Sequence, residues 1–148
     1  MQGVIRFAVF VLVSLIFGCS FSSNGERIFF TATSKNGPIT IKEGPPMIKN
    51  AVKGCAHCHG RDSKGGHSLD ATGMKGNDIR YSKLTLKYSG YLSFLEGKNV
   101  KINGGVDTLI KRAIIDGEVP GYKLNIAMPR WAMTDEDLND VISYLKTL

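Results

Sequence analysis

A cysteine pair followed directly by a histidine lies in the first half of the chain, at residues 55–59 (CAHCH). In this C-x-x-C-H spacing, the thiols of Cys55 and Cys58 can each add to one vinyl group of a haem. His59 can then ligate the haem iron through its neutral imidazole. The other interpretations are a redox-active cysteine pair and a zinc site that also recruits His67. No βαβ pattern is visible around the motif, as a thioredoxin-like pair would require, and we favour covalent haem attachment.

A methionine followed by a proline, Met128-Pro129, supplies a candidate for the sixth iron ligand. An iron held by His59 needs such a ligand to cycle electrons without binding small molecules, and a soft thioether favours Fe(II). Pro129 lacks a backbone donor and stiffens the chain, which suits a ligand loop that crosses the haem face. From the residues alone, Met74 and Met133 remain alternative ligands, and a buried core methionine is the alternative without ligation.

The two residues after this motif, Arg130 and Trp131, are candidates for contact with the haem propionates. Both side chains carry N–H donors, which can bond or pair with carboxylates. The alternative is a solvated arginine beside an aromatic residue at the rim of the site. We expect His57 and His67 to be exposed rather than to ligate iron.

The first 18 residues have the pattern of a targeting segment. Arg6 supplies a positive charge, and residues 7–17 form an apolar run too short to span a bilayer as a helix. The run ends in Gly18-Cys19, which resembles a bacterial lipobox, so we predict a lipoprotein signal peptide at residues 1–18 and lipidation of Cys19. Ordinary secretory cleavage and an uncleaved anchor are the alternatives. We expect the mature chain in the bacterial cell envelope, on the periplasmic or outer-surface side, anchored to a membrane by lipid.

The size and charge of the chain limit its partners. Its 148 residues suit one domain, and the formal net charge is +6. The lysines are scattered, without a basic helix face or adjacent aromatic residues, which argues against a nucleic-acid partner. A positive surface that docks an acidic redox partner is one interpretation, and an ordinary solvated surface is the other. Three cysteines are awkward for disulfides, and the count is resolved if Cys55 and Cys58 carry haem and Cys19 does something else.

The organisation along the chain predicts a short linker at residues 19–23 and one folded domain at residues 24–148. A short capped helix is expected around residues 24–29. Apolar residues at helical spacing predict two further helices near the end of the chain, around residues 106–114 and 138–145. Both apolar stripes are expected to pack in the core.

The middle of the chain gives weaker patterns. An Asn-Gly pair at residues 36–37 predicts the turn of a small β-hairpin with strands at residues 31–33 and 39–41. Residues 60–103 are rich in glycine and are expected to be mostly loop, able to wrap a flat prosthetic group. Alternation of apolar residues suggests a short strand at residues 84–88.

Several motifs within residues 24–148 together resemble those of class I c-type cytochromes. They are Gly25-x-x-x-Phe29, C-x-x-C-H-G at residues 55–60, Met128-Pro129, and Tyr144-Leu145 in the last helix. The resemblance implies a mostly α-helical fold wrapped around one covalent haem, whose first and last helices cross at near right angles. Gly25 would allow their close approach, and Phe29 and Tyr144 would pack at the crossing. The segment between Phe29 and Cys55 is longer than is usual in that family and contains the predicted hairpin.

The same resemblance implies an extracytoplasmic protein that transfers single electrons between redox partner proteins by Fe(III)/Fe(II) cycling, and not an enzyme. It would hold one haem c through Cys55 and Cys58, with His59 and Met128 as axial ligands. One alternative is a haem-based ligand sensor or peroxidase-like enzyme, in which a small molecule displaces Met128. Another is a redox subunit of a larger oxidase or reductase.

Overall fold

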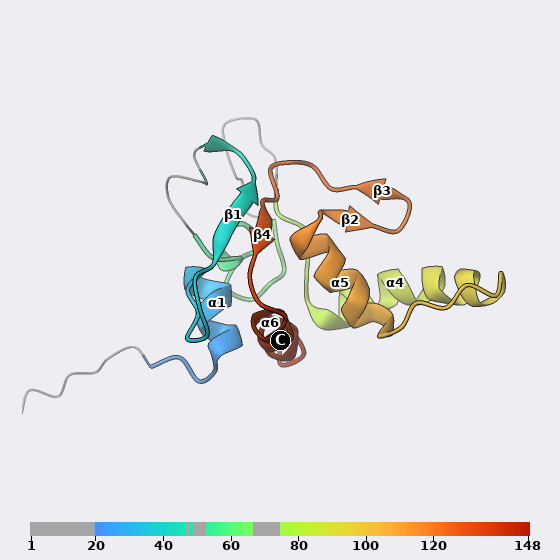
Figure 1. The fold of residues 1–148 in the computed structure, drawn as a ribbon, viewed down its shortest axis with the longest axis horizontal. Helices are drawn as coiled ribbons and strands as arrows, with labels where there is room; N and C mark the ends of the chain where they lie inside the picture. Colours follow the sequence, from blue (N-terminus) through green and yellow to red (C-terminus); the bar gives the residue numbers. More distant parts are fainter. Residues whose placement is uncertain (1–19, 47, 49–52, 67–74) are drawn as a thin grey trace, which may run out of the picture.

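Helices account for most of the regular structure, as predicted, and four short strands lie between them (Figure 1). The computed structural model describes residues 20–46, 48, 53–66 and 75–148. Its helices are α1 (Asn24–Thr31), α3 (Ala56–His59), α4 (Tyr81–Glu96), α5 (Gly105–Ile115) and α6 (Asp135–Leu145). Its strands are β1 (Thr40–Glu43), β2 (Glu118–Val119), β3 (Tyr122–Lys123) and β4 (Arg130–Ala132). The predicted signal peptide, Cys19, His67 and Met74 lie outside the described residues. Among the described helices, none combines the length and the apolar character needed to cross a membrane.

Helices from the two ends of the domain, α1 and α6, make the most extensive contact between elements. A Cβ atom on Gly25 would lie 2.0 Å from the carbonyl oxygen of Asp140, so a larger residue could not take this position without moving the helices apart. The ring centroids of Phe29 and Tyr144 lie 5.3 Å apart at the same contact. The predicted close packing of the first and last helices is therefore confirmed.

The two predicted helices near the end of the chain are confirmed as α5 and α6. Thr134 caps α6, because its side chain accepts a hydrogen bond of 3.1 Å from the backbone N–H of Asp137. The apolar stripes of both helices are buried with α1 in one core, which includes Ile28, Phe29, Leu109, Ile110, Ala113, Ile114, Leu138, Val141, Ile142 and Leu145. Several of these core residues also form one wall of the site described below.

The predicted β-hairpin between residues 31–33 and 39–41 is wrong. β1 instead pairs antiparallel with β4 from the other end of the chain, with Ile41 opposite Trp131. α1 extends into the first predicted strand and ends at Thr31, and its cap residue Ala32 adopts the left-handed conformation with φ 53°. The pairing with β4 attaches the segment after α1 to the strand that directly follows the Met-Pro motif.

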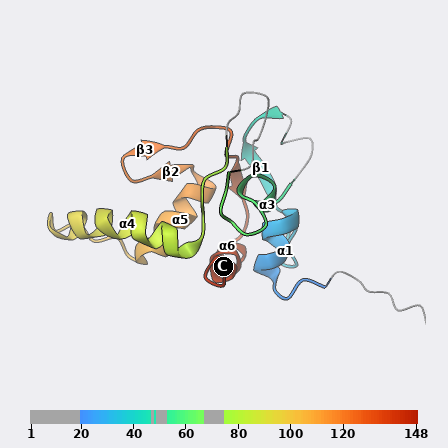
Figure 2. The same cartoon turned by 180° about the vertical axis from the view of Figure 1, so that it is seen from behind.

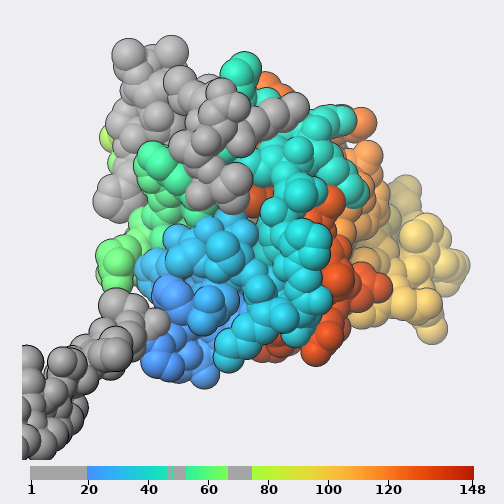
Figure 3. Space-filling view, turned by 60° about the vertical axis from the view of Figure 1, so that its left-hand side comes forward, coloured from blue at the N-terminus to red at the C-terminus, as the bar shows by residue number. Residues whose placement is uncertain are grey.

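A buried carboxylate fixes the loop between α1 and β1. Asp137 is fully buried, and its Oδ1 accepts hydrogen bonds from Ser34, from Asn24 (3.0 Å) and from Asn36 (3.0 Å). Burial raises the pKa of Asp137, but these hydrogen bonds together lower it by more, so the group is ionised at neutral pH. Asn36 therefore bonds to α6 rather than forming a hairpin turn. In Figure 3 the segment after α1 (teal) lies across the surface between α1 (blue) and the C-terminal residues (red).

The predicted strand at residues 84–88 is also wrong, because these residues belong to the 16-residue helix α4. Half-buried or buried side chains recur in α4 at helical spacing, at Tyr81, Leu84 and Tyr88, whereas Leu86 is 73% exposed. The apparent alternation arose because Leu86 is an exposed apolar residue. Much of the stretch expected to be loop is therefore helix, and α4 extends outward from the rest of the fold (Figures 1 and 2).

Candidate functional site

The C-x-x-C-H motif begins one residue before α3 and ends at the last residue of that helix, next to α1 (Figure 2). The backbone around it is closely packed on both sides. A Cβ atom on Gly54 would lie 2.3 Å from the carbonyl oxygen of Phe29, and one on Gly76 would lie 2.0 Å from that of Cys58. The motif is therefore held in place between α1 and residues 75–77.

Before any haem is attached, the two thiols of the motif would be protonated at neutral pH. Burial raises the pKa of Cys55 to about 11 and also raises the pKa of Cys58. A redox-active C-x-x-C pair needs the opposite, a thiol whose pKa is lowered so that the thiolate forms. The environment of these thiols thus disfavours the redox-pair interpretation and is compatible with addition of each S–H across a vinyl double bond.

A hydrogen bond to a backbone carbonyl sets which nitrogen of the His59 imidazole can bind a metal. Its Nδ1 lies 2.8 Å from the carbonyl oxygen of Asn77, which can only accept, so Nδ1 carries the proton. Burial lowers the pKa of His59, and the hydrogen bond to Asn77 raises it. Burial has the larger effect, so the pKa lies below its ordinary value. The ring is therefore neutral at neutral pH, and Nε2 has a free lone pair. A hydrogen bond donated by the other ring nitrogen to an acceptor is the usual way in which a ligating histidine is oriented.

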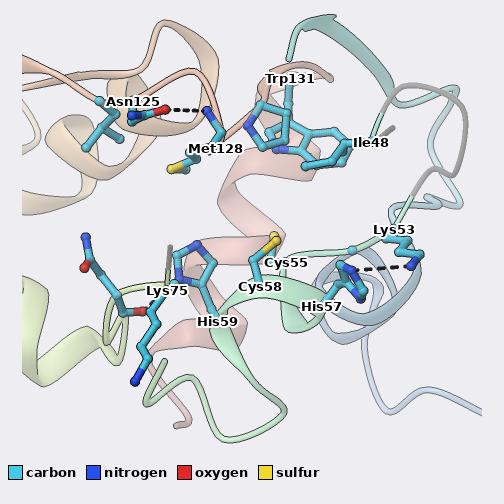
Figure 4. Close-up of a pocket in the computed structure, with 16 residues that line it drawn as sticks. Ile48, Lys53, Cys55, His57, Cys58, His59, Lys75, Asn125, Met128 and Trp131 are labelled. Atoms are coloured by element: carbon cyan, nitrogen blue, oxygen red, sulfur yellow. Dashed lines mark hydrogen bonds between the residues drawn. The ribbon is translucent and has the colours of Figure 1, made fainter. Parts of the chain in front are cut away.

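The thioether of Met128 and the imidazole of His59 lie on opposite sides of one cavity (Figure 4). This cavity has a volume of about 240 Å³. A second cavity of about 310 Å³ adjoins it, and both share Cys55, His59, Asn77, Leu124 and Met128. The structure therefore brings together the predicted proximal ligand His59, the predicted distal ligand Met128 and Cys55. Met133, the alternative ligand within the described residues, lines neither cavity.

The two cavities differ in their walls. Cys58 and Trp131 line the first. The second is lined mainly by apolar side chains of α1, α4, α5 and α6, including Phe29, Leu84, Tyr88, Ile110, Ile114, Val141 and Leu145. Together they form a mainly apolar space whose two parts meet at Cys55, His59 and Met128 and which reaches the helical core. A flat apolar ring with a central metal fits this space, because ligand atoms face it from two sides and the cysteine pair lies in its wall.

The two residues after the Met-Pro motif have different positions. Trp131 is 5% exposed and lines the first cavity. Arg130 lines neither cavity, and its guanidinium instead bonds to the backbone carbonyls of Met128 and Leu124. Their contact with haem propionates stays a prediction. His57 is exposed, as expected, and its Nε2 lies 3.4 Å from the Lys53 ammonium.

Sequence reasoning missed two contributors to the site. Asn77 acts on His59 through a backbone carbonyl, which any residue type can supply, so no side-chain pattern could have identified it. The apolar wall provided by α4 was missed because that helix was not predicted. The spacing of Tyr81, Leu84 and Tyr88, three and four residues apart, was the available signal.

The zinc interpretation finds no support in the part of the chain that the structure describes. There, no group of three or more His, Cys, Asp or Glu side chains is placed so that it could share one metal ion. His67, which that interpretation also requires, lies outside the described residues. The geometry of a single imidazole facing a thioether is instead typical of an iron with two axial ligands.

Comparisons with known proteins agree with this geometry. The family model for cytochrome c matches residues 48–148, more than half of the chain. No curated protein and no solved structure matches the chain. Proteins of the matched family bind haem c covalently, use it to transfer electrons, and interact with redox partner proteins. The chain therefore belongs to the cytochrome c family, and haem c is its cofactor.

Proposed function

We propose that the protein is an electron carrier with one haem, which it holds through Cys55 and Cys58 and ligates through His59 and Met128. The observation that carries the proposal is the position of the His59 imidazole and the Met128 thioether across one apolar cavity, with Cys55 lining the same space (Figure 4). When bound, the haem supplies an iron that gains and loses one electron. Asn77 keeps His59 in the tautomer that ligates.

The residues around the cavities favour a carrier over an enzyme. Asp78 is the one carboxylate among the described residues that line either cavity, and Arg80 binds it at 2.6 Å. That hydrogen bond from the guanidinium lowers the pKa of Asp78 to about 2, so the carboxylate stays ionised and paired at neutral pH. Among the described wall residues, no unpaired carboxylate is thus available to act as an acid or base beside Met128. The walls of the second cavity are mainly apolar, which would limit reorganisation when the charge on a bound iron changes.

Ligand binding and peroxide turnover distinguish a carrier from a sensor or enzyme. With both axial positions filled by protein side chains, the ferrous wild-type protein is expected to bind CO poorly near neutral pH, and peroxide turnover should stay at background. Stopped-flow mixing with CO and a peroxidase assay measure both properties, and reversible voltammetry should show a single one-electron wave. Rapid CO binding or sustained peroxide turnover by the intact protein would favour the sensor or enzyme alternative.

We also propose that the chain is exported to the bacterial cell envelope and anchored through lipid on Cys19. The proposal rests on the Arg6 charge, the apolar run at residues 7–17 and the Gly18-Cys19 sequence. Each buried acyl CH₂ contributes about 0.8 kcal/mol, so several chains would hold the protein firmly on a membrane.

Replacing the proposed lipid attachment site tests the anchor. Wild-type protein should partition with membranes and resist washing at high salt, whereas Cys19→Ser should fail to be lipidated and should keep an unprocessed N-terminus. Mass spectrometry of the intact proteins, together with fractionation, measures both effects. If wild-type and Cys19→Ser proteins instead had the same processed N-terminus, without acyl chains, the chain would be secreted in the ordinary way.

A further inference from the structure

A buried arginine lies beside the segment that carries Met128. Arg130 is 6% exposed and belongs to β4, which is fixed by its pairing with β1. Its Nη1 donates to the carbonyl oxygen of Met128, and its Nη2 donates to that of Leu124 at 2.6 Å. One planar guanidinium thus holds two backbone carbonyls of the loop that places the thioether.

No carboxylate neutralises this guanidinium among the described residues, where the salt bridges do not include Arg130. Burying a charge without an opposite charge is costly, and hydrogen bonds must compensate. Backbone carbonyls are therefore the main partners of this charge. The two carbonyls thus compensate the buried charge, and the guanidinium in turn holds them.

Gly117, at the start of residues 117–128, makes room for the guanidinium of Arg130. Gly117 has φ +64°, and a Cβ atom there would lie 1.9 Å from the Arg130 Cζ and Nε atoms. The carbonyl oxygen of Gly117 also accepts a hydrogen bond of 2.7 Å from the backbone N–H of Leu124. The Arg130 side chain thus lies against Gly117 at the start of residues 117–128, and it bonds to Leu124 and Met128 further along.

We propose that Arg130 is a positioning residue for the axial ligand: its guanidinium holds the Leu124–Met128 segment so that the Met128 thioether stays directed at the cavity. The inference rests on the proposed role of Met128 as ligand. Pro129 stiffens the link between the two residues, and the Met128 carbonyl accepts its hydrogen bond from the side chain of Arg130. Without the guanidinium, the loop is expected to open while the helices remain folded.

The test compares ligation with folding in the holoprotein. In oxidised wild type, the weak far-red charge-transfer band of methionine-ligated iron and the far-UV circular dichroism should be lost together on heating. In Arg130→Gln the band should be lost at a lower temperature, before the helices unfold, and the ferrous protein should bind CO at least about tenfold faster, because a hydrogen bond from a charged donor is removed. Arg130→Lys keeps the charge but lacks the planar fork whose two nitrogens reach separate carbonyls, so it should lie between these two proteins.

A matched control is Arg112→Gln. Arg112 is an exposed residue of α5 whose guanidinium bonds to Glu118 at 2.7 Å, at the start of the same loop but away from Met128. It should behave like wild type in both measurements. Gly117→Ala should reproduce the early loss of the band by displacing the guanidinium.

The inference is overturned if the band and the circular dichroism are lost together in both Arg130 variants, because Arg130 would then serve only the stability of the fold. It is also overturned if Arg112→Gln loses the band as early as Arg130→Gln. A wild-type protein without the band would instead contradict the ligation by Met128 on which the inference rests.

Discussion

Met128→Ala is expected to abolish the far-red charge-transfer band, lower the reduction potential and open the ferrous protein to CO. The thioether favours Fe(II), so its loss stabilises Fe(III). A fall on the order of 0.1 V or more is expected, since axial ligands set haem potentials over a range of about 0.8 V. Absorption spectroscopy of the oxidised protein, voltammetry and CO titration measure the three effects.

Met133→Ala is the matched control for this prediction. Met133 packs against the core but lines neither of the cavities beside His59, so its truncation should lower stability without removing the band. Loss of the band in Met133→Ala or in Met74→Ala, with the band retained in Met128→Ala, would move the ligand assignment to that methionine.

Gly25→Ala is expected to destabilise the protein by at least about 2 kcal/mol, because the added methyl group forces apart two packed helices. The new Cβ would lie 2.0 Å from the Asp140 carbonyl oxygen and 3.0 Å from the Tyr144 Cβ atom. Backbone cannot rotate away as a flexible side chain can, so α1 and α6 must separate. Denaturant unfolding of the holoprotein, followed by far-UV circular dichroism, measures the change.

Gly90→Ala supplies the control for the same substitution in a helix. Nothing lies within 4 Å of a Cβ atom built on Gly90, which is an exposed residue of α4. Alanine is the better helix former, so Gly90→Ala should stabilise the protein by about 0.5–1 kcal/mol. A Gly25→Ala protein as stable as wild type would show that the contact between α1 and α6 is looser than the structure indicates.

The parts of the fold that could be predicted from the sequence are those that depend on short-range spacing. The apolar stripes of α5 and α6 recur every three or four residues, and the motif at residues 55–59 fixes the cysteines and His59 within one turn. The close approach at Gly25 followed from the resemblance to known cytochromes and not from the local pattern.

The parts that were mispredicted depend on contacts between distant residues. β1 pairs with β4, which is almost ninety residues further along the chain, so the local Asn-Gly signal suggested a nearer partner. Asn36 was read as a turn residue, but the buried carboxylate of Asp137 competes for its side chain. An exposed residue, Leu86, disguised the helical spacing of α4 as alternation.

The candidate site shows the same division. His59 and Met128 were identified by their neighbours in sequence, and the structure places them across one cavity. The carbonyl of Asn77 and the bonds made by Arg130 follow from where the backbone passes, which the sequence does not encode locally. The guanidinium of Arg130 bonds to the Met128 and Leu124 carbonyls, and its contact with a haem propionate stays a prediction.

The attachment of haem through both cysteines is tested most directly by extraction of the denatured protein with acid acetone, followed by a pyridine haemochrome spectrum. Wild-type protein should keep its haem through extraction, and the spectrum should have the band position of a haem with two thioether bonds. Cys55→Ala and Cys58→Ala should each shift that band to the position of a haem with one thioether bond, and the double variant should release its haem. Haem that extracts from the wild-type protein, or a protein that contains zinc and no haem, would contradict the account.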